Sequence, residues 1–351
     1  MKKMMALSLC AALLLAGCGG AKAPEEKKSG GEEKKLVLST YGLSEDISAE
    51  EVYKPFEDQF NAKIVTETGS TNERYTKLSA DAESTIDVIE LSQAMTAKGI
   101  EEGLFEPLDL SKIENSQYLI GAAKSMAEAG QGVAYTINSI GIMYDPEAVG
   151  FEITSFNDLW KAELEGSIAI PDITTTFGPA MVYMASDYKG VDVASDSGKA
   201  AFEALEELKP NLVKTYAKSS DLINMFTSGE IKAAIVGDFG VPTIQEANPS
   251  LVYVTPDVTY ANFNTISITK NCEDKDLAYE YINYRLSKEL QEKTSKALNE
   301  APTNNQVEIA EDQAANMTYG PAAENAKVLD YSFVNPILSD WIDQWNRIIN
   351  S

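Results

Sequence analysis

The sequence predicts an α/β protein with two domains. Its 351 residues exceed what one ordinary hydrophobic core organises. Short apolar, β-branched segments alternate with helical patterns, which is typical of mostly parallel sheets flanked by helices. The alternation starts again after Asp172, so a second α/β unit is inserted into the first.

The N-terminus has the pattern of a bacterial export signal. Lys2 and Lys3 precede an apolar run, Ala6–Ala16, which is well short of the roughly 20 residues needed to span a bilayer. The following Leu15–Cys18 resembles the lipobox of bacterial lipoproteins. This resemblance implies that the signal peptide is residues 1–17 and that Cys18 carries lipid; an ordinary signal with an incidental cysteine is the alternative.

Residues 18–34 are predicted to be the lipidated cysteine and a flexible linker. After Cys18 this segment has no apolar residue larger than alanine or proline, so it cannot bury a core. A tether of this length reaches roughly 20 to 25 Å from its anchor.

The first part of lobe 1 is predicted over residues 35–136. Strands are expected at 35–40, 62–66 and 86–91, and Ser70 with Glu73 forms a capping box for a helix between the last two. Ligands of such sheets bind beyond the carboxyl ends of the strands. The residues expected there are Thr40, Tyr41, Ser92 and Gln93.

Residues 132–172 are predicted to carry the chain out of the first lobe. Strands at 133–137 and 140–144, a short helix after Ser155 and a strand at 167–170 make a βαβ-sized unit. Lobe 2 is expected to span 137–264. Residues 265–351 are expected to return to lobe 1 and to end in an amphipathic helix over 333–349. Three tryptophans are predicted to be core residues: Trp160, Trp341 and Trp345.

Composition excludes several classes of function. The chain has 54 acidic and 29 basic residues, a net charge of −25, which disfavours nucleic acid as a partner. It has no histidine, so His-dependent triads are excluded and no metal, cofactor or enzymatic activity is expected. Apart from Cys10 and Cys18 the chain has one cysteine, Cys272, which excludes a disulfide within the mature chain if Cys18 is lipidated.

From Leu36 to about Leu298 the chain resembles the spermidine/putrescine-type periplasmic binding proteins of ABC importers. Seven segments carry the resemblance: Glu57–Phe60, Ile86–Ile89, Glu102–Leu108, Ile140–Asp145, Ser155–Trp160, Gly166–Ile170 and Gly229–Ala234.

The resemblance implies a two-lobed type II periplasmic-binding-protein fold with two hinge strands. It further implies a monomer outside the cytoplasm that closes on a small-molecule solute without altering it. The closed form would dock on an ABC permease and, through it, on ATPase subunits, while the lipid anchors the protein to the membrane. A surface receptor or adhesin that has kept the fold is the alternative of another class.

The predicted cleft has aromatic walls and polar groups. Tyr41, Phe177, Phe239 and Tyr260 are expected as walls. The helix N-termini near Ser92 and near Thr174–Thr176 suit an anionic group of the solute. Asp172 and Asp238, with Glu90 nearby, suit an amine, or the two aspartates serve only as turn caps. Ligand-binding residues are expected to be Thr40, Tyr41, Ser92, Gln93, Asp172, Thr174, Thr175, Asp238, Phe239 and Asn264.

Polyamine-binding relatives place acids and tryptophans where this chain has other residues. Isoleucine and threonines follow Asp172, Gly237 stands in place of a tryptophan, and Asn264 stands in place of an aspartate. A polyamine or another amine is the favoured solute, and a carboxylate, phosphonate or thiamine-like solute is the alternative.

Overall fold

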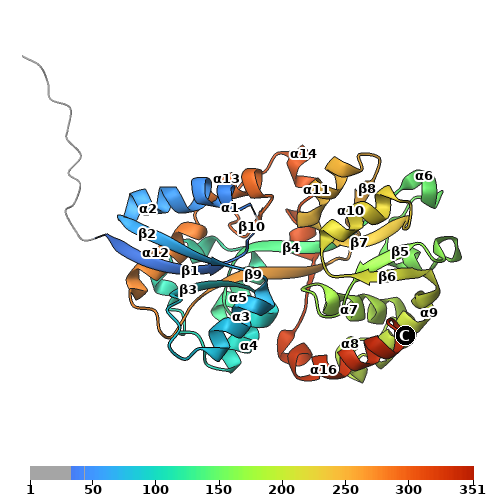
Figure 1. Cartoon of the computed structure of the whole chain (residues 1–351), viewed down its shortest axis with the longest axis horizontal. Coiled ribbons are helices and arrows are strands. Elements are labelled where there is room, and N and C mark those ends of the chain that lie inside the picture. Colours follow the sequence, from blue (N-terminus) through green and yellow to red (C-terminus); the bar gives the residue numbers. More distant parts are fainter. Residues whose placement is uncertain (1–32, 43) are drawn as a thin grey trace, which may run out of the picture. The chain divides into compact units, whose positions relative to one another are not determined.

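A computed structural model describes residues 33–42 and 44–351 (Figure 1). The predicted signal peptide, Cys18 and nearly all of the linker lie outside the described residues. Within the described part, no helix is both long and apolar enough to cross a membrane.

One continuous strand path runs through the body, in the order β2-β1-β3-β9-β4-β7-β5-β6. At the first end β2, β1 and β3 are parallel to one another, and β9 is antiparallel to β3. At the other end β7, β5 and β6 are parallel, and β7 is antiparallel to β4. The strands of the path are β1 (Lys34–Thr40), β2 (Ala62–Thr68), β3 (Val88–Ser92), β4 (Val133–Tyr144), β5 (Ile168–Pro171), β6 (Leu212–Tyr216), β7 (Ala233–Gly237) and β9 (Tyr260–Ile268).

Strands β4 and β9 connect the two lobes (Figure 1). The first part of β4 pairs with β9 and with β10 (Ala301–Pro302), and its last part pairs with β7 and β8 (Val252–Val254). Apolar residues and small polar residues let β4 be buried along all 12 of its residues. The type II binding-protein architecture, with two hinge strands, is therefore present as predicted.

Two large cores lie on either side of these strands. The first contains Phe56, Phe263 and Tyr281, and the second contains Phe156, Phe202 and Trp341. The helices before β4 are α1 (Glu45–Ser48), α2 (Lys54–Phe60), α3 (Thr71–Ala80), α4 (Gln93–Glu101) and α5 (Gly121–Glu128).

The helices between β4 and β9 belong to the second lobe, and the others follow β9. Those between are α6 (Pro146–Val149), α7 (Gly178–Lys189), α8 (Val193–Asp196), α9 (Lys199–Leu208), α10 (Ser219–Thr227) and α11 (Val241–Ala247). Those following are α12 (Lys275–Arg285), α13 (Lys288–Leu298), α14 (Glu311–Ala314), α15 (Pro321–Asn325) and α16 (Tyr331–Ile348).

Helix α16 packs on a different lobe from the one predicted for it. The assignment of 265–351 to lobe 1 fails here, because Trp341 and Trp345 of α16 are buried in the second core. The indole N–H of Trp341 donates to the carbonyl of Ser197 at 2.9 Å, and α16 lies along the second lobe beside α8 and α9 (Figure 1). The chain therefore crosses between the lobes a third time, through β11 (Lys327–Val328), which pairs with β9.

Candidate functional site

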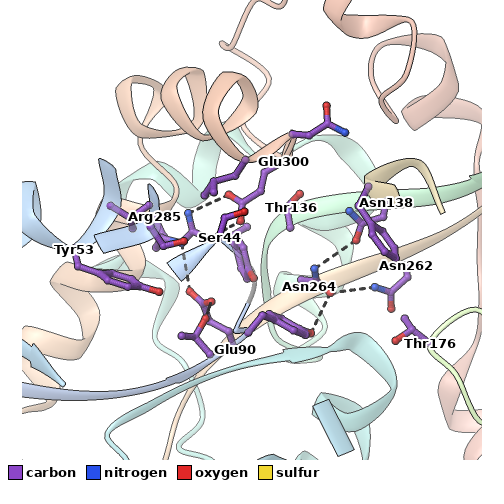
Figure 2. A pocket seen from close by; sticks show the side chains of 18 of the residues that line it. Ser44, Tyr53, Glu90, Thr136, Asn138, Thr176, Asn262, Asn264, Arg285 and Glu300 are labelled. Atoms are coloured by element: carbon purple, nitrogen blue, oxygen red, sulfur yellow. Dashed lines mark hydrogen bonds and ion pairs between the residues drawn. The ribbon is translucent and has the colours of Figure 1, made fainter. Parts of the chain in front are cut away.

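A cavity of about 250 Å³ lies between the two lobes (Figure 2). The ends of β1 and β3 supply one wall, the loops after β5 and β7 supply another, and the hinge strands form the floor. Its main lining residues are Thr40, Tyr41, Ser44, Tyr53, Glu90, Tyr135, Thr136, Asn138, Thr176, Phe177, Phe239, Asn262, Asn264, Tyr281, Arg285, Asn299 and Glu300.

Three asparagines form the polar floor of this cavity. Asn262 and Asn264 are two residues apart on β9, so they share a face, and Asn138 pairs with Asn262 from β4. Asn264 accepts from Asn262 Nδ2 at 3.2 Å and donates to Asn138 Oδ1 at 3.4 Å. The Oδ1 atom of Asn262, a residue only 2% exposed, has no hydrogen-bond partner among the described residues. The floor therefore offers a buried acceptor to a ligand.

A cluster of charged residues closes one side of the cavity. Arg285 donates from Nε to Glu90 at 3.3 Å and from both terminal nitrogens to Glu300 at 3.3 and 3.2 Å. Its guanidinium also lies 4.2 Å from the centre of the Tyr135 ring. Burial lowers the pKa of Arg285, but Glu300, Glu90, Tyr281 and Tyr135 together raise the pKa well above its usual value.

The two carboxylates of this cluster differ in their availability. Glu90 is 3% exposed and already accepts from Thr40, Tyr281 and Arg285. The side chain of Glu300 is 22% exposed and is hydrogen-bonded only to Arg285 among the described residues. Glu300 therefore has oxygen lone pairs free for a ligand, whereas Glu90 serves to hold its neighbours in place.

Aromatic side chains form the remaining walls. The Tyr41 hydroxyl donates to Asn264 at 3.3 Å and accepts from Thr71 at 2.9 Å, and Arg74 lies 4.4 Å from the centre of the Tyr41 ring. Burial raises the pKa of Tyr41, and Arg74 opposes this shift. Such π-faces bind cations favourably.

The opposite wall comes from the second lobe. Phe177 and Phe239 lie with ring centres 6.2 Å apart and planes 14° apart. Both rings cover Gly237: a Cβ there would lie 2.6 Å from Phe239 and 2.8 Å from Phe177. Glycine at 237 is what allows the two rings to occupy this space.

A second cavity of about 580 Å³ adjoins the first at Thr176, Phe177 and Phe239. The N-termini of α3, α4, α7 and α10 meet this cavity. It has no aspartate, glutamate, lysine or arginine among its described lining residues, which include Ser70, Thr71, Asn72, Ser92, Thr174, Thr175, Tyr216 and Ser219.

The structure brings together seven of the ten predicted ligand-binding residues. Those lining the first cavity are Thr40, Tyr41, Phe239 and Asn264, and those lining the second are Ser92, Thr174, Thr175 and again Phe239. Gln93 instead faces a groove between α4, α5 and residues 328–336. Tyr260, expected as a wall, belongs to the second core, and its hydroxyl donates to Asp187.

Asp172 and Asp238 do not line either cavity. Asp172 Oδ1 accepts from the backbone and hydroxyl of Thr174, at 3.0 and 2.6 Å, and so caps its own turn. Asp238 is 3% exposed and accepts from the backbone and hydroxyl of Thr318. Burial raises the pKa of Asp238 to about 6, although the hydrogen bonds from Thr318 oppose the shift.

Several residues that line the first cavity were not predicted from the sequence. Arg285 and Glu300 belong to the end of α12 and the turn after α13, where charged residues usually face solvent. Asn262 offered a weak signal, because it shares the period-two face of Asn264, together with the apolar residues Tyr260, Ile266 and Ile268.

A family model described as bacterial extracellular solute-binding protein matches residues 51–321. The chain belongs to this family. It is therefore a binding protein rather than an enzyme, and it is a solute-binding component of the ABC-transporter type.

Individual relatives agree with this assignment. The chain is 26% identical over 310 residues to spermidine/putrescine-binding periplasmic protein 1 of Haemophilus influenzae, covering 84% of this chain and 82% of that protein. It is 22% identical over 283 residues to the gamma-aminobutyric acid-binding protein of Pseudomonas aeruginosa, covering 78% of each. The crystal structure of an ABC transporter from Clostridium perfringens superposes with a TM-score of 0.84 at 54% identity, covering 90% of this chain and all of that one.

Proposed function

We propose that this solute-binding protein captures a small amine in the cavity between its lobes and delivers it to an ABC permease. The single observation that supports an amine most is the cavity itself: an available carboxylate, Glu300, faces a space lined by six aromatic rings, those of Tyr41, Tyr53, Tyr135, Phe177, Phe239 and Tyr281. Carboxylates pair with ammonium groups, and aromatic faces attract cations.

Capture is proposed to proceed by lobe closure. Tyr41 belongs to the first lobe and Phe239 to the second, so a solute touching both gains contacts only when the lobes approach. Its differential affinity then shifts an open-to-closed equilibrium. No covalent step is required, and the solute is released unchanged.

Anchoring is proposed through lipid on Cys18, at the cell surface or in the periplasm. The apolar run before Cys18 and the Leu15–Cys18 motif support this placement. Mass spectrometry of the protein purified from membranes tests it: a Cys18→Ala variant should lose the acyl mass and leave the membrane fraction.

A zwitterionic solute is the second candidate. The adjoining cavity presents helix N-termini and the hydroxyls of Ser92 and Thr175, without an acid to repel a carboxylate. The ammonium would remain in the first cavity.

A thermal-shift screen with small-angle scattering tests the proposed function. Amines, amino acids, carboxylates and phosphonates are added to the purified chain without its signal. An amine at a hundred times its Kd should add about 2.7 kcal/mol of stability and reduce the radius of gyration. Stabilisation by another solute class, with no amine effective, would contradict the proposal.

A further inference from the structure

We infer that the cleft accepts a solute with a single ammonium group, bound at Glu300, and discriminates against di- and tricationic polyamines. This inference rests on the proposed function and specifies the charge of the solute.

The charged lining of the cleft supports one cation only. Among the described residues, the first cavity is lined by two carboxylates, Glu90 and Glu300, and one guanidinium, Arg285, which leaves a net charge of −1. The second cavity adds no charge of either sign. One ammonium neutralises this lining; a second would be buried without a counter-charge, which is unfavourable.

Charged residues near the cavity add no negative charge to its lining that would bind a second ammonium group. Asp172 and Asp238, the two other acids considered for amine binding, line neither cavity, and their carboxylates accept hydrogen bonds from Thr174 and Thr318. Arg74, 4% exposed, lies behind the Tyr41 ring and donates to the carbonyls of Ser39 and Gly69. Its positive charge opposes additional cations.

The geometry also specifies an acceptor for the single ammonium. Glu300 has lone pairs beyond those used by Arg285. Asn262 Oδ1, a buried acceptor without a partner among the described residues, lines the same cavity but lies away from Glu300 (Figure 2), so it would accept from a different donor group of the solute. An unpaired buried acceptor is costly and is relieved by a ligand that donates a hydrogen bond.

Isothermal titration calorimetry with three four-carbon probes tests the inference. Butylamine, 4-aminobutyrate and putrescine share a chain and one ammonium, and differ in whether the other end is methyl, carboxylate or ammonium. We expect putrescine to bind the wild-type chain at least tenfold more weakly than the better of the other two.

Two variants test the charge count directly. Asn264→Asp adds a carboxylate to the floor with almost no change in shape, so putrescine affinity should rise at least tenfold relative to butylamine. Asn305→Asp adds the same charge at an exposed position outside the cavities and should leave the ratio unchanged.

Removing the available carboxylate is the complementary test. Glu300→Gln should weaken the better monoammonium probe at least tenfold, whereas Glu289→Gln, at an exposed position of α13, should not. Thermal melts confirm that each variant folds. The comparison of the three probes on the wild-type chain tests the inference even if a variant fails to fold.

The outcomes separate the two proposals. If putrescine binds the wild type more tightly than both other probes, the single-ammonium inference is overturned while amine capture stands. If none of the three binds and a solute of another class does, amine capture itself is wrong.

Discussion

Asp238 accepts hydrogen bonds from both the backbone N–H and the hydroxyl of Thr318, a residue 80 positions later in the sequence. The Thr318 hydroxyl is also bonded to Ser139 of β4 at 2.8 Å. This contact ties the turn after β7 in the second lobe to the segment between α14 and α15. A buried carboxyl thus sits at the junction of the lobes, directly before Phe239 of the cavity wall.

Stability should respond to pH through Asp238. Its pKa is about 6 in the folded protein and about 3.9 when unfolded. A raised acid pKa gives a stabilising contribution that is complete below the unfolded value and is lost as pH rises through the folded value. Relative to Asp238→Asn, the wild type should gain about 3 kcal/mol on acidification, mostly between pH 6 and 4.

Urea unfolding at a series of pH values checks this expectation. The comparison of wild type with variant cancels the titration of the other carboxyls. Asp257→Asn removes an exposed aspartate and serves as the matched control. A free-energy difference between wild type and Asp238→Asn that is flat from pH 7 to 4 would show that Asp238 titrates normally.

Gly237→Ala should displace the aromatic wall. Its new Cβ would meet Phe239 at 2.6 Å and Phe177 at 2.8 Å, so both rings must move. Overpacking of this kind costs about 1–3 kcal/mol, and we expect at least a fivefold loss of solute affinity by calorimetry. Gly121→Ala, with no atom near its Cβ, is the control. Unchanged affinity in Gly237→Ala would show that the rings do not contact the solute.

Trp341→Ala should destabilise the second lobe. The indole is 1% exposed, packs edge-to-face against Phe202 with the ring planes at 69°, and donates a hydrogen bond to the carbonyl of Ser197. Loss of a buried tryptophan costs about 3–5 kcal/mol. Denaturant unfolding measures the loss, and hydrogen exchange should show it first in α7–α9. Loss of protection in α2 and α12 instead would contradict the placement of α16.

Much of the fold was predictable from residue patterns. Strand Val88–Ser92 and helix Thr71–Ala80 follow from apolar clustering and from the capping box of Ser70 and Glu73, which are local properties. The lobe to which α16 belongs was not predictable. Its apolar stripe specifies that one face is buried but does not specify which core covers that face.

The candidate site was predictable only in part. Thr40 and Ser92 follow from the rule that ligands bind beyond strand ends, and the structure places both at the cleft. The roles of Asp172 and Asp238 depend on whether Thr174 and Thr318 reach their carboxylates, which is a tertiary question. The ion pair of Arg285 and Glu300 forms because the turn after α13 brings Glu300 back to the end of α12. No local sequence pattern predicts this contact.

The third crossing of the chain constrains how the lobes can move. Two connecting strands, β4 and β9, define a line about which one lobe rotates against the other. A third connection far from this line would have to stretch during rotation, but Lys327–Val328 pairs with β9 and so lies beside it. A rotation of one lobe against the other about β4 and β9 would therefore leave this third link unstretched.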